Sequence, residues 1–116
     1  MDIALKRAYD KPAKQDGHRV LVDGLWPRGV SKDEAKIAEW RKEIAPSQTI
    51  RKAFHDGSLA WGEFRRRYLK ELMSHRDLLR DLAKRAQKEK VTLVFAAKDE
   101  DYNNAVIVRQ YLKMLG

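Results

Sequence analysis

The chain has 116 residues, enough to bury one hydrophobic core and too few for two well-packed ones, so we expect a single domain over residues 1–116. Apolar residues make up 43% of it, which excludes a disordered chain, and the absence of cysteine excludes disulfides, thiolate nucleophiles and cysteine-bound zinc. The net charge of +8 favours anionic partners. Without an apolar stretch of signal-peptide or membrane-spanning length, we expect a cytoplasmic protein with no membrane partner.

Two short apolar runs begin the chain. Residues 3–5 and 19–22 are typical of strands, and the Asp, Pro and Gly residues between them mark a loop. Ser31 and Glu34 then have the spacing of a capping box, and apolar residues follow at intervals of three and four. The sequence therefore predicts a helix that begins at Ser31 and ends before Pro46.

Three more helices are predicted before the clearest strand of the chain, residues 91–97. Each follows a serine that could cap its first turn, and each carries apolar residues at helical spacing. The three serines are Ser47, Ser58 and Ser74. A last helix, with apolar residues at positions 105, 108, 112 and 115, closes the chain.

This order of elements indicates the fold class. A buried strand, several helices, a second buried strand and a closing helix give a βαβα order, which implies parallel pairing with a right-handed crossover. We therefore expect an α/β fold, a small three-layer structure whose parallel or mixed sheet has helices on both faces. The direction of the first strand stays open, because a link of about ten residues is short for a parallel crossover.

Two loops are expected to form a site, because ligands of parallel sheets bind outside the carboxyl ends of the strands. These loops, residues 23–29 and 98–101, should be neighbours. In the first, Trp26-Pro27-Arg28-Gly29 has the composition of a type I turn, which would hold the guanidinium of Arg28 ready for a carboxylate or phosphate. Arg28 could instead pair with Asp23, and Trp26 could stack on a ring or belong to the core.

Polar residues near these loops complete the candidate site. Asp23 is a candidate catalytic or ligand-orienting carboxylate, and Lys98 a candidate anion ligand. His55, at a predicted helix end, could transfer protons or simply be stabilised by the helix dipole. One of Asn103 and Asn104 should cap the last helix, which leaves the other for a ligand.

Ser47 differs from the other capping serines, because the turn Ala45-Pro46-Ser47 could face the same pocket. No histidine has a partner at metal-ligand spacing, so we predict no metal site. No glycine-rich phosphate loop or dinucleotide fingerprint is present, which argues against an ordinary NTPase or dehydrogenase, and no cofactor is expected.

A longer pattern runs through these loops and most of the chain. It consists of residues 20–23 and 25–31, Trp40, residues 45–47, Arg51, residues 54–56, Trp61, Phe64, residues 67–68, residues 95–99 and residues 103–105. In this pattern the sequence closely resembles the YeaO-like branch of the domain-of-unknown-function family 488, a group of small bacterial and archaeal proteins. The resemblance implies a small α/β fold without an established activity, and it adds Arg51 to the ligand-binding set.

One position departs from the family pattern, which usually has arginine where this chain has Gly24. If that arginine belongs to a ligand site, this protein either binds its ligand less tightly or relies more on Arg28. The sequence does not separate these two interpretations.

Three functions follow as hypotheses. The first is binding of a small anionic ligand, phosphate- or carboxylate-bearing and including nucleotide-like molecules, with Asp23 orienting the ligand or serving as a base. The second is a nucleic-acid-binding module that uses the basic helices of residues 63–90, which carry 10 basic and 5 acidic side chains; their alternative role is a solvated helix surface. The third is a hydrolase or transferase that uses Asp23 and His55 together.

Overall fold

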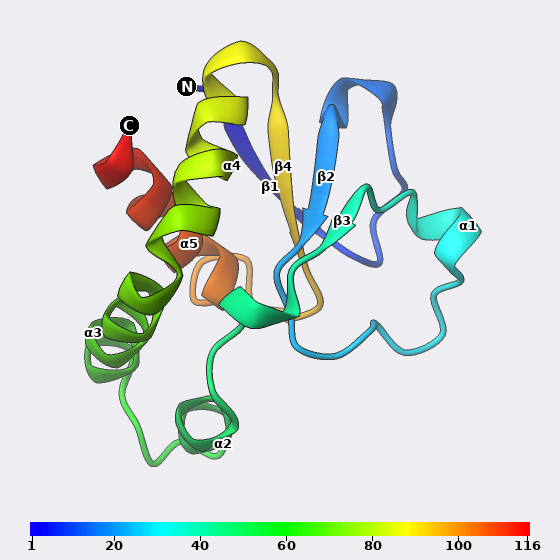
Figure 1. The fold of residues 1–116 in the computed structure, drawn as a ribbon. Helices are drawn as coiled ribbons and strands as arrows, with labels where there is room; N and C mark the ends of the chain where they lie inside the picture. The colour runs from blue at the N-terminus through cyan, green and yellow to red at the C-terminus, as the bar shows by residue number, and fades with distance from the viewer.

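The computed structural model describes residues 1–116 and contains one four-stranded sheet (Figure 1). The strand order is β1-β4-β2-β3 and every pairing is parallel, so the first strand also joins in parallel. The α/β class is thereby confirmed. The strands are β1 (Ile3–Arg7), β2 (His18–Leu21), β3 (Glu39–Trp40) and β4 (Val91–Phe95).

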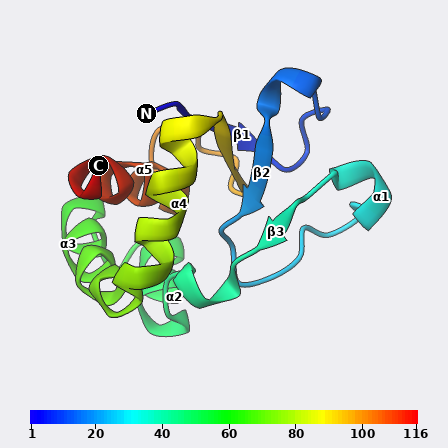
Figure 2. The ribbon, with the colours of Figure 1, turned by 45° about the horizontal axis from the view of Figure 1, so that its top comes forward.

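Four of the five helices gather on one side of the sheet (Figures 1 and 2). These are α2 (Gln48–His55), α3 (Trp61–Leu72), α4 (Arg76–Lys88) and α5 (Asn104–Leu115), whereas α1 (Lys32–Ala35) is a single turn on the far side of β3. Single 3-10 turns lie at residues 14–16, 42–44 and 73–75.

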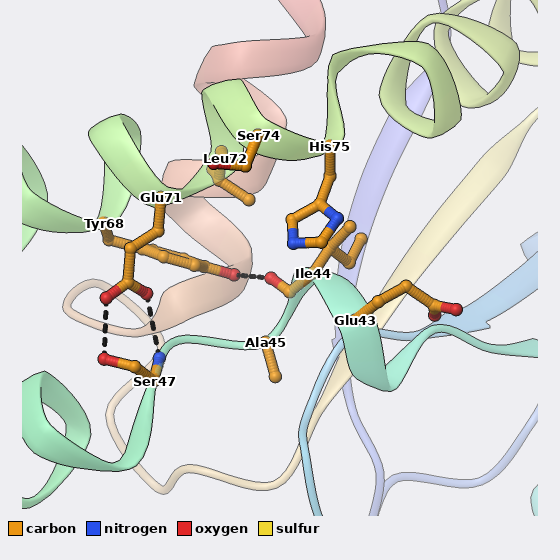
Figure 3. Close-up of a pocket in the computed structure, with 9 residues that line it drawn as sticks. All are labelled: Glu43, Ile44, Ala45, Ser47, Tyr68, Glu71, Leu72, Ser74 and His75. Carbon is orange, nitrogen blue, oxygen red and sulfur yellow. Dashed lines mark hydrogen bonds between the residues drawn. The ribbon is translucent and has the colours of Figure 1, made fainter.

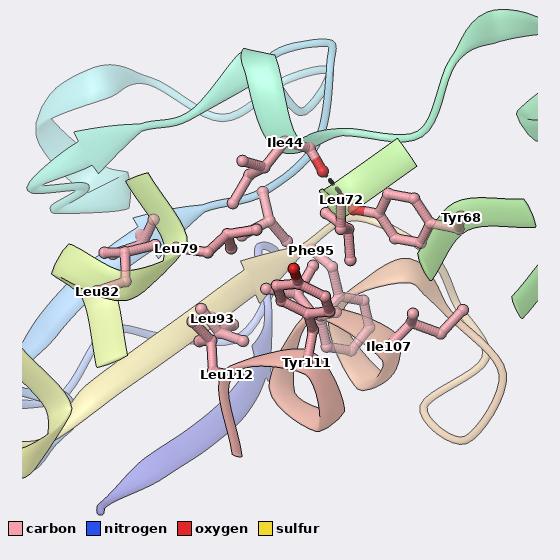
Figure 4. Close-up of a cluster of buried hydrophobic side chains, with 14 of the residues drawn as sticks. Ile44, Tyr68, Leu72, Leu79, Leu82, Leu93, Phe95, Ile107, Tyr111 and Leu112 are labelled. Atoms are coloured by element: carbon pink, nitrogen blue, oxygen red, sulfur yellow. Dashed lines mark hydrogen bonds between the residues drawn. The ribbon is translucent and has the colours of Figure 1, made fainter. Parts of the chain in front are cut away.

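The main core lies between the sheet and these four helices. Alternate residues of the central strand β4, namely Val91, Leu93 and Phe95, point into it and are at most 2% exposed. The helices bring the matching apolar stripes that the sequence predicted, and Figure 4 shows Leu72, Leu79, Leu82 and Leu112 around the strand. This core fixes the positions of α3 and α5, which carry polar residues to the carboxyl edge of the sheet.

The opposite face of the sheet has a thinner cover. Leu21 and Val94 alternate onto this face, where loop residues Trp26 and Ile37 pack with Trp40 of β3. The helical part of this layer is the single turn α1, and loops supply the rest. The loop after β2 therefore runs to this face, and α5, which follows β4, lies on the other.

The predicted helix from Ser31 to Ala45 is wrong after its first turn. Lys36 has a left-handed conformation, with φ of 52°, which ends α1. The chain then extends along β2, where the Ala38 amide donates to the Arg19 carbonyl and the Arg41 amide to the Leu21 carbonyl. Pairing with an existing strand, together with burial of Trp40 on the thin face, outweighed a helical spacing that did not distinguish these alternatives.

Only one of the four predicted serine caps is present. Ser31 does cap α1, because its hydroxyl accepts the Glu34 amide at 3.1 Å. The side chains of the other three serines cap no helix: Ser47 binds Glu71, Ser58 binds Asp56, and Ser74 lies within a 3-10 turn. A serine near the start of a helix can cap it, but its hydroxyl can also bond a nearby carboxylate, as those of Ser47 and Ser58 do.

Candidate functional site

The carboxylate of Asp23 lies where the loops after β2 and β4 separate toward opposite faces of the sheet. Such a divergence between adjacent parallel strands opens the crevice in which α/β proteins bind ligands. Oδ2 of Asp23 accepts a hydrogen bond of 2.8 Å from the Ala96 amide, one residue beyond β4. Asp23 therefore contacts the segment directly after β4, as its position after a parallel strand predicted.

Asn104 holds the other oxygen of this carboxylate. Its Nδ2 donates to Oδ1 of Asp23 at 2.9 Å and to the Val22 carbonyl at 3.1 Å. Asn103 is the buried cap of α5 and accepts the Val106 amide at 3.1 Å. Asn103 therefore caps the start of α5, as expected for one of the pair, whereas the Nδ2 of Asn104 already makes two hydrogen bonds within the protein.

Burial raises the pKa of Asp23 above its usual range, although the hydrogen bonds from Asn104 and Ala96 and the charge of Arg51 act in the opposite direction. Arg51, on α2, is exposed, and its side chain makes no hydrogen bond or ion pair. Each oxygen of Asp23 has accepted one hydrogen bond and has capacity for another. The pair therefore offers a ligand one free cation and one carboxylate acceptor.

Tyr68 connects this carboxylate to a neighbouring cavity. Its ring is fully buried, its hydroxyl donates to the Ile44 carbonyl, and burial together with the charges of Asp23 and Glu71 raises its pKa well above the usual value. The sequence showed Tyr68 only as one residue of an apolar stripe. The available signal was that a tyrosine within a core stripe needs a partner for its hydroxyl.

The cavity beside Tyr68 has a volume of about 340 Å³ and opens between the 42–44 turn and α3 (Figure 3). Ser47 lines it and is held by Glu71, whose carboxylate accepts the Ser47 amide at 2.9 Å and hydroxyl at 2.6 Å. Glu71 thereby stabilises the start of α2, which carries Arg51. The lining residues are Glu43, Ile44, Ala45, Ser47, Tyr68, Glu71, Leu72, Ser74 and His75.

The predicted turn around Arg28 lies one residue later than expected. The Val30 amide donates to the Pro27 carbonyl, and Gly29 has φ of 80°, which suits the third position of a type II turn. The side chain of Arg28 is exposed and forms no ion pair with Asp23. Trp26 is half-buried, with its indole NH bonded to the Val30 carbonyl, and it meets Trp40 edge to face at 5.4 Å.

His55 and Lys98 are exposed, and their side chains make no hydrogen bond or ion pair. His55 ends α2, and its charge contributes to the lowered pKa of Asp56, which mainly reflects hydrogen bonds from Ser58. The groups that shift the pKa of Asp23 include Arg51 and do not include His55. The cooperation of Asp23 with His55 stays a prediction without support from this geometry.

Part of the positive charge of residues 63–90 is paired. Arg66 and Arg67 both bond to Glu63, whose pKa these arginines lower to about 2, and Arg85 bonds to Glu89 at 3.0 Å. These helices therefore carry fewer free cations than their composition suggested. No helix has the length and apolar character needed to cross a membrane.

Comparisons with known proteins place this chain in a family. The chain is 43% identical to the "Uncharacterized protein YeaO" of Escherichia coli (strain K12), over 99% of its own length and 100% of that protein. It is 34% identical to the "Uncharacterized protein Rv3073c" of Mycobacterium tuberculosis, over 95% of its length and 92% of that protein. No solved structure matches. Residues 2–115 match the family described as "Inactive DUF488-N3 subclade", and the chain is a YeaO-like member of this DUF488 family.

Proposed function

We propose that this protein binds a small phosphate- or carboxylate-bearing ligand at the carboxyl edge of its sheet. The observation that carries the proposal is the carboxylate of Asp23, each oxygen of which accepts one hydrogen bond, together with the exposed guanidinium of Arg51, whose charge acts to lower the pKa of that carboxylate. Arg51 would form two parallel hydrogen bonds to the anion, and Asp23 would accept one from a hydroxyl of the same ligand.

The surroundings of this pair support a binding role. Four separate segments contribute: the loop after β2, the segment after β4, the start of α5 and α2 supply Asp23, Ala96, Asn104 and Arg51. The Asp23 side chain is already fixed by two hydrogen bonds. A site fixed in advance loses little conformational entropy when a ligand binds. Arg28 and Lys98, both exposed, stand on the loops that follow β2 and β4 and are proposed to add charge around the anion.

Binding without catalysis is the form of this function that the family description favours, because it names an inactive subclade. The nucleic-acid alternative is less favoured, since Arg66 and Arg67 share the carboxylate of Glu63. A hydrolase that pairs Asp23 with His55 has no contact to support it.

Thermal unfolding in the presence of inorganic phosphate, citrate and ribose 5-phosphate tests the proposal. A ligand at 100 times its Kd stabilises the folded state by about 2.7 kcal/mol, which a melting curve resolves easily. Arg51→Gln should abolish the stabilisation, and Lys52→Gln, its neighbour on the same exposed helix, should preserve it. Stabilisation by none of the three compounds, or equal stabilisation of Arg51→Gln, would refute the proposal.

A further inference from the structure

An aromatic cluster lies beside the proposed anion site. Phe54 of α2 and Trp61 of α3 have ring centroids 5.6 Å apart, and Trp61 meets Tyr102 at 5.3 Å. Tyr102 comes from the loop between β4 and α5, the same loop that brings Asn104 to Asp23. Tyr102 lies outside the core, because the residue is 53% exposed.

The cluster and the anion site share their elements. Arg51 and Phe54 are three residues apart on α2, which places them one above the other on the helix surface. Tyr102 precedes Asn104 by two residues. The contacts of Trp61 with Phe54 and Tyr102 therefore connect the helix that carries the free guanidinium to the loop that fixes the carboxylate.

Tyr102 presents a free aromatic face on a fixed backbone. Its ring and that of Trp61 are inclined at 73°, an edge-to-face contact that occupies at most one face of the tyrosine. The backbone is held because Oδ1 of Asp99 accepts the amides of Asp101 and Tyr102, each at 2.9 Å, and Asn103 donates to the Asp99 carbonyl. An exposed ring fixed in this way is a stacking surface that needs little reorganisation.

We infer that the ligand of this site carries a planar aromatic ring as well as its anionic group, as a nucleoside monophosphate does. This inference rests on the proposed function. The phosphate binds Arg51, a ribose hydroxyl donates to Asp23, and the base stacks on the free face of Tyr102. From the sequence, Trp26 could stack on a ring or belong to the core; its ring is half-buried against Trp40 and its NH is already bonded, which favours the core role.

Calorimetric titration with adenosine 5′-monophosphate and ribose 5-phosphate separates the ring from the phosphate. Stacking on an aromatic side chain should make the nucleotide bind about tenfold or more tightly than the sugar phosphate. Tyr102→Phe keeps the ring and should keep this advantage. Tyr102→Leu still covers Trp61 but cannot stack in the same way, so the advantage should disappear while ribose 5-phosphate binds unchanged.

The outcomes distinguish this inference from the proposed function. If both compounds bind equally and Arg51→Gln abolishes both, the anion site stands and the aromatic inference is wrong. If the nucleotide advantage persists in Tyr102→Leu, the ring binds elsewhere and the assignment to Tyr102 is overturned. If neither compound binds, the proposed function fails and this inference fails with it.

Discussion

The hydroxyl of Tyr68 should contribute measurably to stability, because it donates to the Ile44 carbonyl within a fully buried environment (Figure 4). Tyr68→Phe keeps the ring and removes only this donor. Leaving a buried carbonyl without its partner costs about 1–3 kcal/mol. For a domain of this size, roughly 4 °C of melting temperature corresponds to each kcal/mol. Chemical denaturation followed by circular dichroism gives the free energy of unfolding directly.

Tyr111 supplies the matched control. Its ring is also buried, at 5% exposure, but its hydroxyl has no hydrogen-bond partner. Tyr111→Phe therefore removes an unsatisfied polar group, and the free energy of unfolding should stay constant or rise by up to about 1 kcal/mol. Equal losses in the two variants would refute this reasoning, because the effect would then follow the loss of any buried hydroxyl and not the loss of a particular hydrogen bond.

Three further results follow from named contacts. Gly17→Ala should destabilise the protein by more than about 1 kcal/mol, because Gly17 has φ of 66° and a Cβ there would overlap the carbonyl oxygen of Lys90, just before β4. An unchanged melting temperature would contradict this prediction. Burial raises the pKa of Asp23, so stability should fall as the pH rises above 3.8 through the native pKa. The charge of Arg51 acts to lower this pKa, so Arg51→Gln should raise it further in an NMR titration, and an unchanged or lowered pKa would contradict this effect of Arg51. Burial of Asp16 acts to raise its pKa, but hydrogen bonds and neighbouring cations outweigh burial, so the pKa is lowered. Stability that is present above pH 3.8 should therefore be lost as the pH falls through the native pKa. Asp16→Asn should remove this part of the acid dependence, and an unaltered acid profile would contradict the assignment.

The parts of the site that sequence reasoning found depend on local rules. Asp23 follows a buried strand, and a helix start explains why one of two adjacent asparagines caps α5, whereas the bonds of Asn104 to Asp23 and Val22 join distant segments. Parallel strands bring their carboxyl ends to one edge, which correctly predicted that Asp23 would lie near the segment after β4. Each of these inferences needs only a few neighbouring residues and the direction of a strand.

The contributions of Tyr68 and Tyr102 depend on packing between distant segments and could not be predicted in that way. Tyr68 reaches the Ile44 carbonyl because residues 42–44 form a 3-10 turn, at a place where the helical spacing had predicted a continuous α-helix. The ring of Tyr102 lies against Trp61, which is 41 positions earlier in the chain, so local spacing does not predict where this ring stands. Spacing identifies apolar faces, but the partner of a face is decided by the whole fold.

Gly24 offers a direct test of the departure from the family pattern. Its backbone does not require glycine, and a Cβ there would meet the Ala45 side chain at an ordinary contact of 3.5 Å. The exposed backbone of Gly24 therefore accepts a side chain, next to Asp23 in the sequence and in contact with Ala45, which lines the cavity. If Gly24 weakens anion binding, Gly24→Arg should bind phosphate several-fold more tightly, Gly24→Gln should not, and the loss caused by Arg28→Ala should become smaller. Unchanged affinity in Gly24→Arg would show that position 24 lies outside the anion site.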